Sequence, residues 1–168
     1  MAQPDQIPTA ADMMTRNIVT LVPDMSIYDA MRVLLKKKIS GAPVVDESGE
    51  MLGILSEKDC FKVLTAEAFD GVPEGCVRDF MSAEVVTVKP EASIFDVVAL
   101  FLRSPFRRVP VLDKSGRLAG QISRRDVLSA IDSIRDNSNL FGSAEMKVAV
   151  EDAVGGVDSA MRRARQER

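Results

Sequence analysis

The chain contains one short segment twice, 67 positions apart. Gly53, Ser56 and Asp59 recur as Gly120, Ser123 and Asp126, each time where a short apolar run meets a Ser-x-x-Asp motif. The repeat extends back without a gap to residue 12, which aligns with residue 79, and about a third of the aligned positions are identical. A repeat of this length predicts two tandem copies of one supersecondary unit.

Apolar residues at helical spacing predict a helix in each copy. Ser26 begins the first helix, with Asp29 at the third position after it, as in a capping box. Lysines 36–38 end this helix, where cations suit its dipole. The residues expected to form the buried stripe are Ile27, Ala30, Met31, Leu34 and Leu35 in the first copy, and Ile94, Val97, Val98, Phe101 and Leu102 in the second.

A β-hairpin and a closing helix follow in each copy. The predicted strands are 42–45 and 51–55 in the first copy, and 109–112 and 118–122 in the second. Each turn begins with Asp and ends with Gly, residues that satisfy the backbone demands of such turns. Pro43 and Pro110 cannot donate a ladder hydrogen bond, which places them at strand starts or edges. With a leading extended piece near Val19 or Val86, each unit is β-α-β-β-α, and the fold class is α/β of the α+β type.

The domain boundaries follow from the repeat and from composition. Residues 1–11 form a polar N-terminal arm, 12–65 the first repeat, 66–76 a connector rich in turn formers, 77–136 the second repeat and 137–168 a C-terminal tail. Within the tail, residues 145–154 have a helical pattern. Packing on the repeats, self-association and mobility all stay open as roles for this tail.

Composition excludes several classes of function. The net charge is −3 and the pI about 5.1, which argues against a nucleic-acid binder driven by phosphate contacts. No apolar run approaches the roughly 18 residues that a membrane helix needs. The first residues lack the basic and apolar regions of a signal peptide. We therefore expect a cytoplasmic protein without membrane insertion.

The chain has two cysteines, Cys60 and Cys76, and no histidine. In a reducing compartment both cysteines are expected to be unpaired thiols; the alternative is a disulfide across residues 61–75. Zinc sites, histidine acid–base catalysis and the Ser-His-Asp triad all lack their usual residues. No metal site and no catalytic residue is predicted.

The repeat resembles the CBS (cystathionine-β-synthase) domain pair, or Bateman module. Met14-Thr15 and Met81-Ser82, the Pro-Val strands, the Asp-x-x-Gly turns and the two Gly-x-x-Ser-x-x-Asp endings carry the resemblance, which covers residues 9–133. It implies a pseudo-twofold pair of repeats with two clefts between them. It also implies a regulatory, energy-sensing module that binds an adenosyl compound such as AMP, ADP, ATP or S-adenosylmethionine.

The resemblance also assigns residues to the two clefts. The first cleft would take Thr20, Ile39, Ser40, Gly41 and Ala42 from repeat one together with Ser123, Arg124 and Asp126 from repeat two. The other cleft would take Thr87, Phe106, Arg107, Arg108 and Val109 together with Ser56, Glu57 and Asp59.

The chemistry of these side chains suits a nucleotide. An ionised Asp59 or Asp126 can accept hydrogen bonds from a ribose cis-diol. Ser56 and Ser123, with the amides at a helix N-terminus, can donate to phosphate oxygens. The segments after Ile39 and Phe106 offer backbone groups to adenine, and Arg supplies a planar fork for phosphate. Ser-x-x-Asp before an apolar run is equally a plain capping box.

The leading hypothesis is a non-enzymatic sensor that binds an adenine nucleotide as a regulatory ligand, with no obligatory cofactor. It signals to an unidentified regulated protein, and the family resemblance implies a homodimer. A ligand-free scaffold, or a sensor of another adenosyl ligand such as S-adenosylmethionine, is the alternative. An enzyme is the third hypothesis, and it has no catalytic motif in its support.

Overall fold

The computed structural model describes residues 7–70, 75–136 and Val148, and it divides the chain into two compact units. Of the described residues, unit 1 contains 7–15, 88–111, 120–136 and Val148, and unit 2 contains 16–70, 75–87 and 112–119. The helix predicted for residues 145–154 lies outside the described residues, apart from Val148. Apart from residues 112–119, around the turn of the second hairpin, each repeat therefore forms a unit together with the segment that leads into the other repeat.

Unit 2 is built around the hairpin of strands β1 (Gly41–Val45) and β2 (Met51–Ser56). Helix α2 (Ile27–Lys37) precedes the hairpin, and helices α3 (Glu57–Asp70) and α4 (Val77–Phe80) follow it. Its core is formed by Leu21, Ile27, Ala30, Leu34, Ala42, Val44, Leu55, Cys60, Val63 and Val77.

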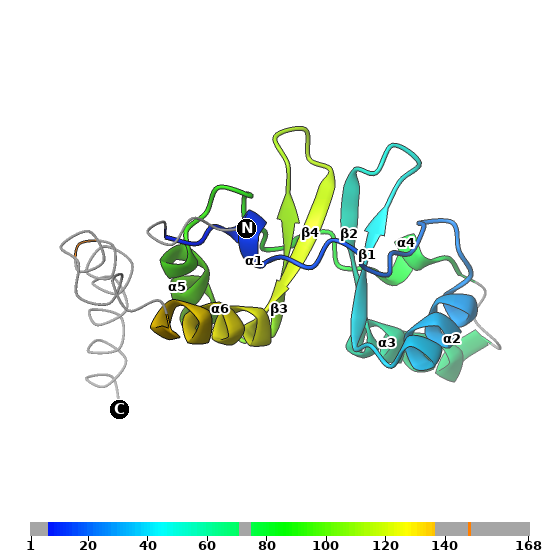
Figure 1. Ribbon diagram of the computed structural model, residues 1–168. Helices are drawn as coiled ribbons and strands as arrows, with labels where there is room; N and C mark the ends of the chain where they lie inside the picture. Colours follow the sequence, from blue (N-terminus) through cyan, green and yellow to red (C-terminus); the bar gives the residue numbers. More distant parts are fainter. Residues whose placement is uncertain (1–6, 71–74, 137–147, 149–168) are drawn as a thin grey trace, which may run out of the picture. The chain divides into compact units, whose positions relative to one another are not determined.

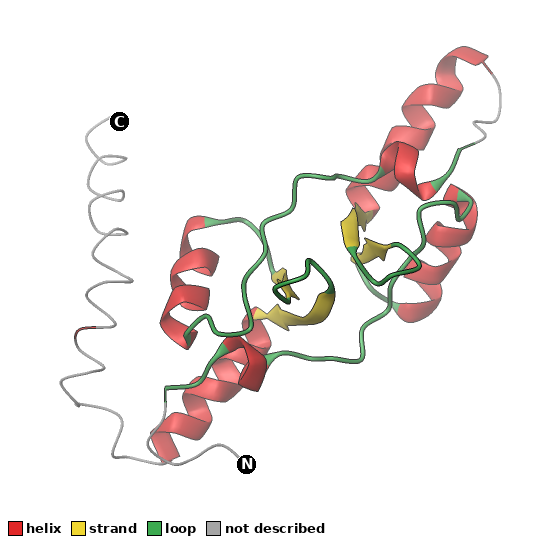
Figure 2. Cartoon of the chain, turned by 90° about the horizontal axis from the view of Figure 1, so that it is seen from above, coloured by secondary structure: helices red, strands yellow, loops and turns green. Residues whose placement is uncertain are grey.

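Unit 1 repeats this arrangement with strands β3 (Arg108–Leu112) and β4 (Leu118–Ser123). Helix α5 (Ile94–Arg103) precedes this hairpin, α6 (Arg124–Asp136) follows it, and the short helix α1 (Ala10–Met13) belongs to the same unit (Figure 1). Figure 2 shows the same succession of a helix, two strands and a helix in each half. The α+β class and the order of elements are as predicted.

The last residue of each predicted apolar stripe is exposed, unlike the rest. Ile27 and Leu34 are buried, whereas Leu35 is 75% exposed, and Leu102 at the matching position is 54% exposed. The prediction that these two leucines are buried was wrong. At 3.6 residues per turn, the eighth residue after Ile27 lies about 80° from it around the helix axis, at the margin of the buried stripe.

The leading segment of each repeat is shorter than a strand. Leu21 forms a single parallel bridge with Val44, and Val88 forms the matching bridge with Val111. The backbone N–H of Leu21 donates to Pro43 O at 2.9 Å, and the N–H of Val45 donates to Leu21 O at 3.0 Å. The named sheets thus have two strands each, with a third segment attached at one residue.

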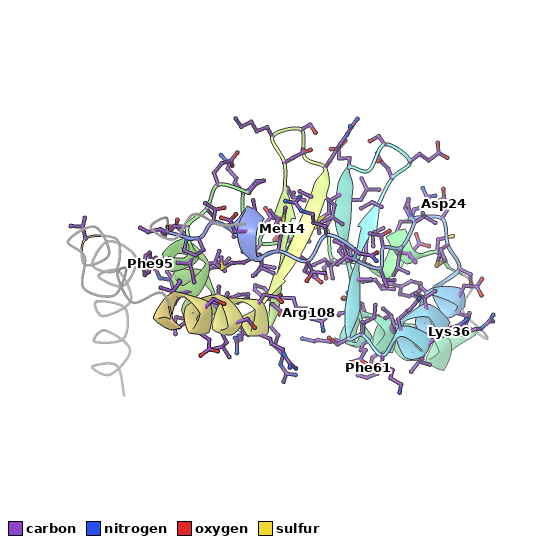
Figure 3. The ribbon with its side chains drawn as sticks, viewed as in Figure 1. Met14, Asp24, Lys36, Phe61, Phe95 and Arg108 are labelled. Carbon is purple, nitrogen blue, oxygen red and sulfur yellow. The ribbon has the colours of Figure 1, made fainter. Side chains whose placement is uncertain are left out.

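The outer edge of each second strand is covered by the lead-in of the other repeat. Ile54 and Ser82 exchange two backbone hydrogen bonds at 3.0 and 2.9 Å, and Gln121 and Thr15 exchange the matching pair, both at 2.9 Å. Gly53 and Gly120 lie beside these bridges. A Cβ on Gly120 would fall 2.5 Å from Met14 Sδ and 3.0 Å from Thr15 O, so the close approach requires glycine. Met14 is labelled in Figure 3.

Pro43 and Pro110 were predicted to lie at the start of a strand or in an edge strand. They are the third residues of β1 and β3, so they do not begin their strands. Pro43 pairs with Ile54 across the hairpin. Because Ile54 directs its N–H and C=O at Ser82, the pair needs no ladder hydrogen bond from the proline. The alternative, that the prolines lie in edge strands, agrees with sheets of two strands.

The predicted N-terminal arm and the predicted connector both contain helical residues. The N–H of Ala10 donates to Ala92 O at 2.7 Å, and Ala10 is fully buried, so the stretch assigned to a polar arm contributes to the core of unit 1. Helix α3 continues to Asp70, through residues 66–70 of the predicted connector. Ala and Glu favour a helix, and the first glycine of the connector comes only at residue 71.

The two hairpin turns are built alike. Asp46 Oδ1 accepts hydrogen bonds from the N–H of Ser48 and of Glu50, both at 2.9 Å, and Asp113 makes the matching bonds to Ser115 and Arg117. Gly49 and Gly116 have φ of +85° and +82°, a region that glycine occupies without strain. The predicted turn chemistry is confirmed.

Replacing Gly53 by alanine should destabilise the chain by about 1–3 kcal/mol. The new Cβ would meet Ser82 O at 2.7 Å and Met81 Sδ at 3.1 Å, so the lead-in segment would have to move. Urea unfolding monitored by circular dichroism measures the loss. Gly49→Asn is the control, because no atom lies within 4 Å of its Cβ and Asn tolerates left-handed backbone. Equal stability of Gly53→Ala and the natural chain would refute the close contact.

Candidate functional site

Each hairpin ends at a serine–aspartate pair that starts the following helix. In unit 2, Asp59 Oδ2 accepts hydrogen bonds from Ser56 N–H at 3.0 Å and Ser56 Oγ at 2.5 Å, and the N–H of Asp59 donates to Ser56 Oγ at 3.2 Å. In unit 1, Ser123 and Asp126 form the same three bonds at 2.7, 2.6 and 3.2 Å. Both pairs are capping boxes, as the plain structural interpretation predicted.

The capping box changes what each side chain can offer a ligand. Both serine hydroxyls donate their hydrogen to an aspartate, so phosphate would have to compete for the hydroxyl donor that the sequence analysis assigned to it. Each aspartate commits Oδ2 to its box. The other carboxylate oxygen, Oδ1, takes no part in the box.

The carboxylate of Asp59 has further partners inside unit 2. Its Oδ1 accepts from Lys62 Nζ at 2.7 Å and from Ser82 Oγ at 3.2 Å, and Lys62 Nζ also donates to Phe80 O at 3.1 Å. Asp59 is 7% exposed. Burial raises the pKa of the Asp59 carboxyl, but hydrogen bonds from Lys62 and Ser56 lower it by more, and the pKa lies below its ordinary value. Asp59 is thus a buried, ionised and fully hydrogen-bonded group.

The segment before each hairpin lies against the start of the closing helix in the same unit. The N–H of Glu57 donates to Ser40 O at 3.0 Å, and the N–H of Arg124 donates to Arg107 O at 3.1 Å. The sequence analysis assigned the two members of each contact to different clefts. The structure brings them together within one unit, so each unit presents a pre-hairpin segment and a Ser-x-x-Asp ending side by side.

The other predicted site residues differ in exposure. Thr20, Ser40, Thr87, Arg107, Arg108, Glu57 and Arg124 are exposed, Phe106 is 45% exposed, and Ile39, Gly41, Ser56, Ser123 and Asp126 are half-buried. Ala42 and Val109 are buried in the two cores, at 1% and 0% exposure. Their side chains serve packing, and a ligand could reach these two positions only through the backbone.

Unit 1 gathers cations where unit 2 does not. The contact between Arg124 and Arg107 brings together two pairs of neighbouring arginines, at 107–108 and 124–125, all four of them exposed. Arg124 Nη2 donates to Ser104 O at 3.2 Å, and its guanidinium lies 5.9 Å from the centre of the Phe101 ring. Arg108, labelled in Figure 3, begins β3. These guanidinium groups suit phosphate oxygens.

Lys62 and Ser82 are the contacts that the site prediction missed. Lys62 follows Asp59 at the i,i+3 spacing at which helical side chains meet, and that signal could have identified it. The contact of Ser82 with Asp59 spans 23 residues and depends on the lead-in crossing to the other repeat, which no local pattern reveals.

Both cysteines are free thiols, as expected, and do not form the alternative disulfide. Cys60 is buried in the core. Burial, with Asp59 and Glu57 nearby, raises the pKa of the Cys60 thiol. Among residues 7–70, 75–136 and 148, the acidic residues and cysteines form no cluster of three that could hold a metal ion. No helix in the described part of the chain is long and apolar enough to span a membrane.

Two tandem units with these features define an α+β repeat module with paired capping-box endings. The family model of the CBS domain matches residues 10–66 and 77–133. The chain belongs to the CBS domain family, and the resemblance inferred from the sequence is confirmed.

Solved structures and relatives agree with this assignment. The chain is similar to the CBSX2 protein of Arabidopsis thaliana crystallised with AMP, with 30% identity, a TM-score of 0.66, and coverage of 76% of this chain and 98% of that one. It is similar to the cytosolic domain of the Mg²⁺ channel MgtE in complex with ATP, with 29% identity, a TM-score of 0.61, and coverage of 73% and 48%.

The sequence is also 32% identical, over 113 residues, to inosine-5'-monophosphate dehydrogenase of Aquifex aeolicus, covering 67% of this chain and 22% of the enzyme. Two proteins of Methanocaldococcus jannaschii match over 89% and 42% of their lengths. The chain thus spans less than half of several curated relatives.

Replacing Asp59 by asparagine should lower the free energy of unfolding by about 1–3 kcal/mol at pH 7, because charge-assisted hydrogen bonds to Lys62 and Ser56 are lost. The folded-state pKa lies below the unfolded value of about 3.9. The stabilisation is therefore complete above that unfolded value and is lost as pH falls through the folded-state pKa.

Urea unfolding at pH 7 and in steps below pH 4 measures this effect, and the difference between the two proteins should narrow as pH falls. Asp29→Asn is the matched control, since Asp29 pairs with Arg32 on the surface at 2.8 Å and such pairs contribute at most about 1 kcal/mol. A difference that stays constant with pH would contradict the role of the ionised carboxylate.

Proposed function

We propose that this chain is a regulatory module that binds an adenine nucleotide of the AMP, ADP or ATP type at its Ser-x-x-Asp endings. The observation that carries the proposal is the pair of carboxylates fixed by capping boxes at helix starts, each beside a pre-hairpin segment of its own unit. Two similar CBS proteins were crystallised with AMP and with ATP, which supports the choice of ligand class.

The proposed contacts follow from the donors and acceptors of each ending. An aspartate accepts from the ribose hydroxyls, and amides of the helix N-terminus with nearby arginines bind phosphate. Backbone groups after Ile39 and Phe106 pair with the adenine edge. The assignment of Thr20, Thr87 and the pre-hairpin residues to a particular ending stays a prediction from the sequence.

The module has a regulatory and not a catalytic role in this proposal. A ligand regulates a partner only when it binds one conformation better than another, and such coupling is typically about 1–3 kcal/mol. A ligand-free scaffold and a sensor of S-adenosylmethionine are the competing functions, and a cytoplasmic location stays a prediction from the sequence.

A homodimer is part of the proposal, and exposed apolar residues support it. Phe61 and Leu128 occupy matching positions on α3 and α6 and are both 65% exposed, and Leu35 and Leu102 match on α2 and α5. Figure 3 labels Phe61 on the outer side of α3. Large apolar side chains in solvent, repeated at one offset, are typical of surfaces that bind another protein.

Nucleotide binding should raise the melting temperature of the purified protein after carried-over ligand is removed. At 100 times its Kd, a ligand stabilises by about 2.7 kcal/mol, which shifts the melting temperature of a domain this size by several degrees. Differential scanning fluorimetry with AMP, ADP, ATP and S-adenosylmethionine measures the shift. A shift only with S-adenosylmethionine would favour that alternative, and no shift with any of the four would leave the scaffold.

The dimer should dissociate when its apolar surface receives charge. Phe61→Asp and Leu128→Asp place a carboxylate where the partner surface is proposed, and light scattering should then report the mass of one chain, 18.3 kDa, instead of two. Val22→Asp is the control, because Val22 is 47% exposed and lies outside these helices. A natural chain that is monomeric at tens of micromolar would refute the dimer.

A further inference from the structure

The two Ser-x-x-Asp endings are equal in sequence pattern and unequal in structure. The Oδ1 atom of Asp59 accepts from Lys62 and Ser82, which uses both of its lone pairs. The Oδ1 atom of Asp126 accepts no hydrogen bond from any residue that the structure describes, and Asp126 is only half-buried. A ribose hydroxyl therefore meets an open acceptor at Asp126 and an occupied one at Asp59.

The difference has a local cause in the sequence. The position of Lys62, three residues after Asp59, is taken by Ser129 three residues after Asp126. Ser129 is exposed, and its short side chain makes no bond to the carboxylate. The lead-in residue that matches Ser82 is Thr15, which bonds Gln121 through its backbone at 2.9 Å but does not reach Asp126 through its hydroxyl.

The charges around the two endings also favour a ligand at Asp126 over one at Asp59. Arg124 and Arg125 directly precede Asp126 at the start of α6, and the backbone contact of Arg124 with Arg107 brings the 107–108 pair to the same helix start. In the described chain none of these four arginines forms an ion pair with a carboxylate. The matching positions beside Asp59 are Ser40, Gly41, Glu57 and Lys58, with one cation and one anion. An anion with several charges is attracted to the first set and gains little from the second.

We propose that the chain binds one polyphosphorylated adenosine nucleotide, through the Asp126 ending, and that Lys62 and Ser82 keep the Asp59 ending from taking a second. The inference rests on the proposed function and adds to it the preferred ending, the number of strong sites and the phosphate class. In the Asp59 ending, a ribose must displace an ammonium held at 2.7 Å, whereas in the Asp126 ending it displaces only solvent.

Isothermal titration calorimetry with ATP, AMP and uncharged adenosine tests the proposal on the full chain. The natural protein should bind one ATP per chain, about tenfold or more tightly than AMP, because additional phosphate charges meet the arginines. Asp126→Asn keeps the size of the side chain and one oxygen for the capping box, but it replaces the other carboxylate oxygen with an amide NH2. It should weaken ATP binding by at least about tenfold. Asp59→Asn should weaken ATP binding much less than Asp126→Asn does, and the surface change Asp29→Asn should leave it within about twofold.

Two opposite changes test whether Lys62 and Ser82 block the Asp59 ending. Lys62→Ala combined with Ser82→Ala frees Asp59 Oδ1, and a second adenosine should then bind, while Lys37→Ala, an exposed charge control on α2, should add none. Ser129→Lys places an ammonium at the matching position and should weaken adenosine binding by about fivefold to tenfold. Ser129→Met has similar length without charge and should bind as the natural chain does. Circular dichroism verifies that each variant is folded.

The outcomes separate the two proposals. Binding of ATP that depends equally on Asp59 and Asp126, or a natural stoichiometry of two equal sites, would overturn this inference and leave the proposed function standing. Ser129→Lys and Ser129→Met with the same affinity would also overturn it. Absence of binding of ATP, ADP and AMP to the natural protein would overturn the proposed function itself.

Discussion

The fold depends on a pair of backbone bridges in which the lead-in of one repeat covers the second strand of the other. Ile54 with Ser82 and Gln121 with Thr15 each exchange two hydrogen bonds. The bridges explain why Gly53 and Gly120 carry no side chain, since a Cβ would collide with the crossing segment. They also explain why a proline can stand in mid-strand opposite Ile54, whose backbone groups already have partners. The same crossing brings Ser82 to Asp59, so it shapes the site as well as the sheet.

Much of this fold could be predicted from the sequence because the chain repeats its local signals. The helices that begin at Ile27 and Ile94 and the hairpins with their Asp-x-x-Gly turns follow from periodicity and turn chemistry, and the structure places them within a few residues of prediction. The exchange of lead-in segments could not be predicted, because it pairs backbone groups far apart in sequence, and no local side-chain pattern marks such pairs. The burial of Ala10 was missed for the same reason.

The residues of the two endings could be predicted from the sequence, but the hydrogen bonds that they form could not. The Ser-x-x-Asp motif identifies both endings, but only the geometry shows that each motif is a closed capping box with one carboxylate oxygen left over. At Asp59 this oxygen is occupied by Lys62 and Ser82, and at Asp126 it is open. The arginines beside Asp126 were visible in the sequence, whereas the contact between Arg107 and Arg124 that gathers them in one unit came from the structure.

The two copies of the unit therefore end in the same sequence motif but offer different chemistry to a ligand. An ionised, buried carboxylate with all lone pairs satisfied stabilises its own unit, and a half-buried one with a free acceptor is suited to a ligand. In such a module, one repeat contributes mainly stability and the other mainly recognition.

The central claim is that an adenine nucleotide is held by the carboxylate of Asp126. A crystal structure of the full chain grown with ATP tests it most directly. The predicted result is a ribose hydroxyl within about 3 Å of Asp126 Oδ1, with phosphate oxygens at the arginines and Asp59 still bonded to Lys62. A nucleotide bound with its ribose at Asp59, or bound without contact to either carboxylate, would contradict the claim.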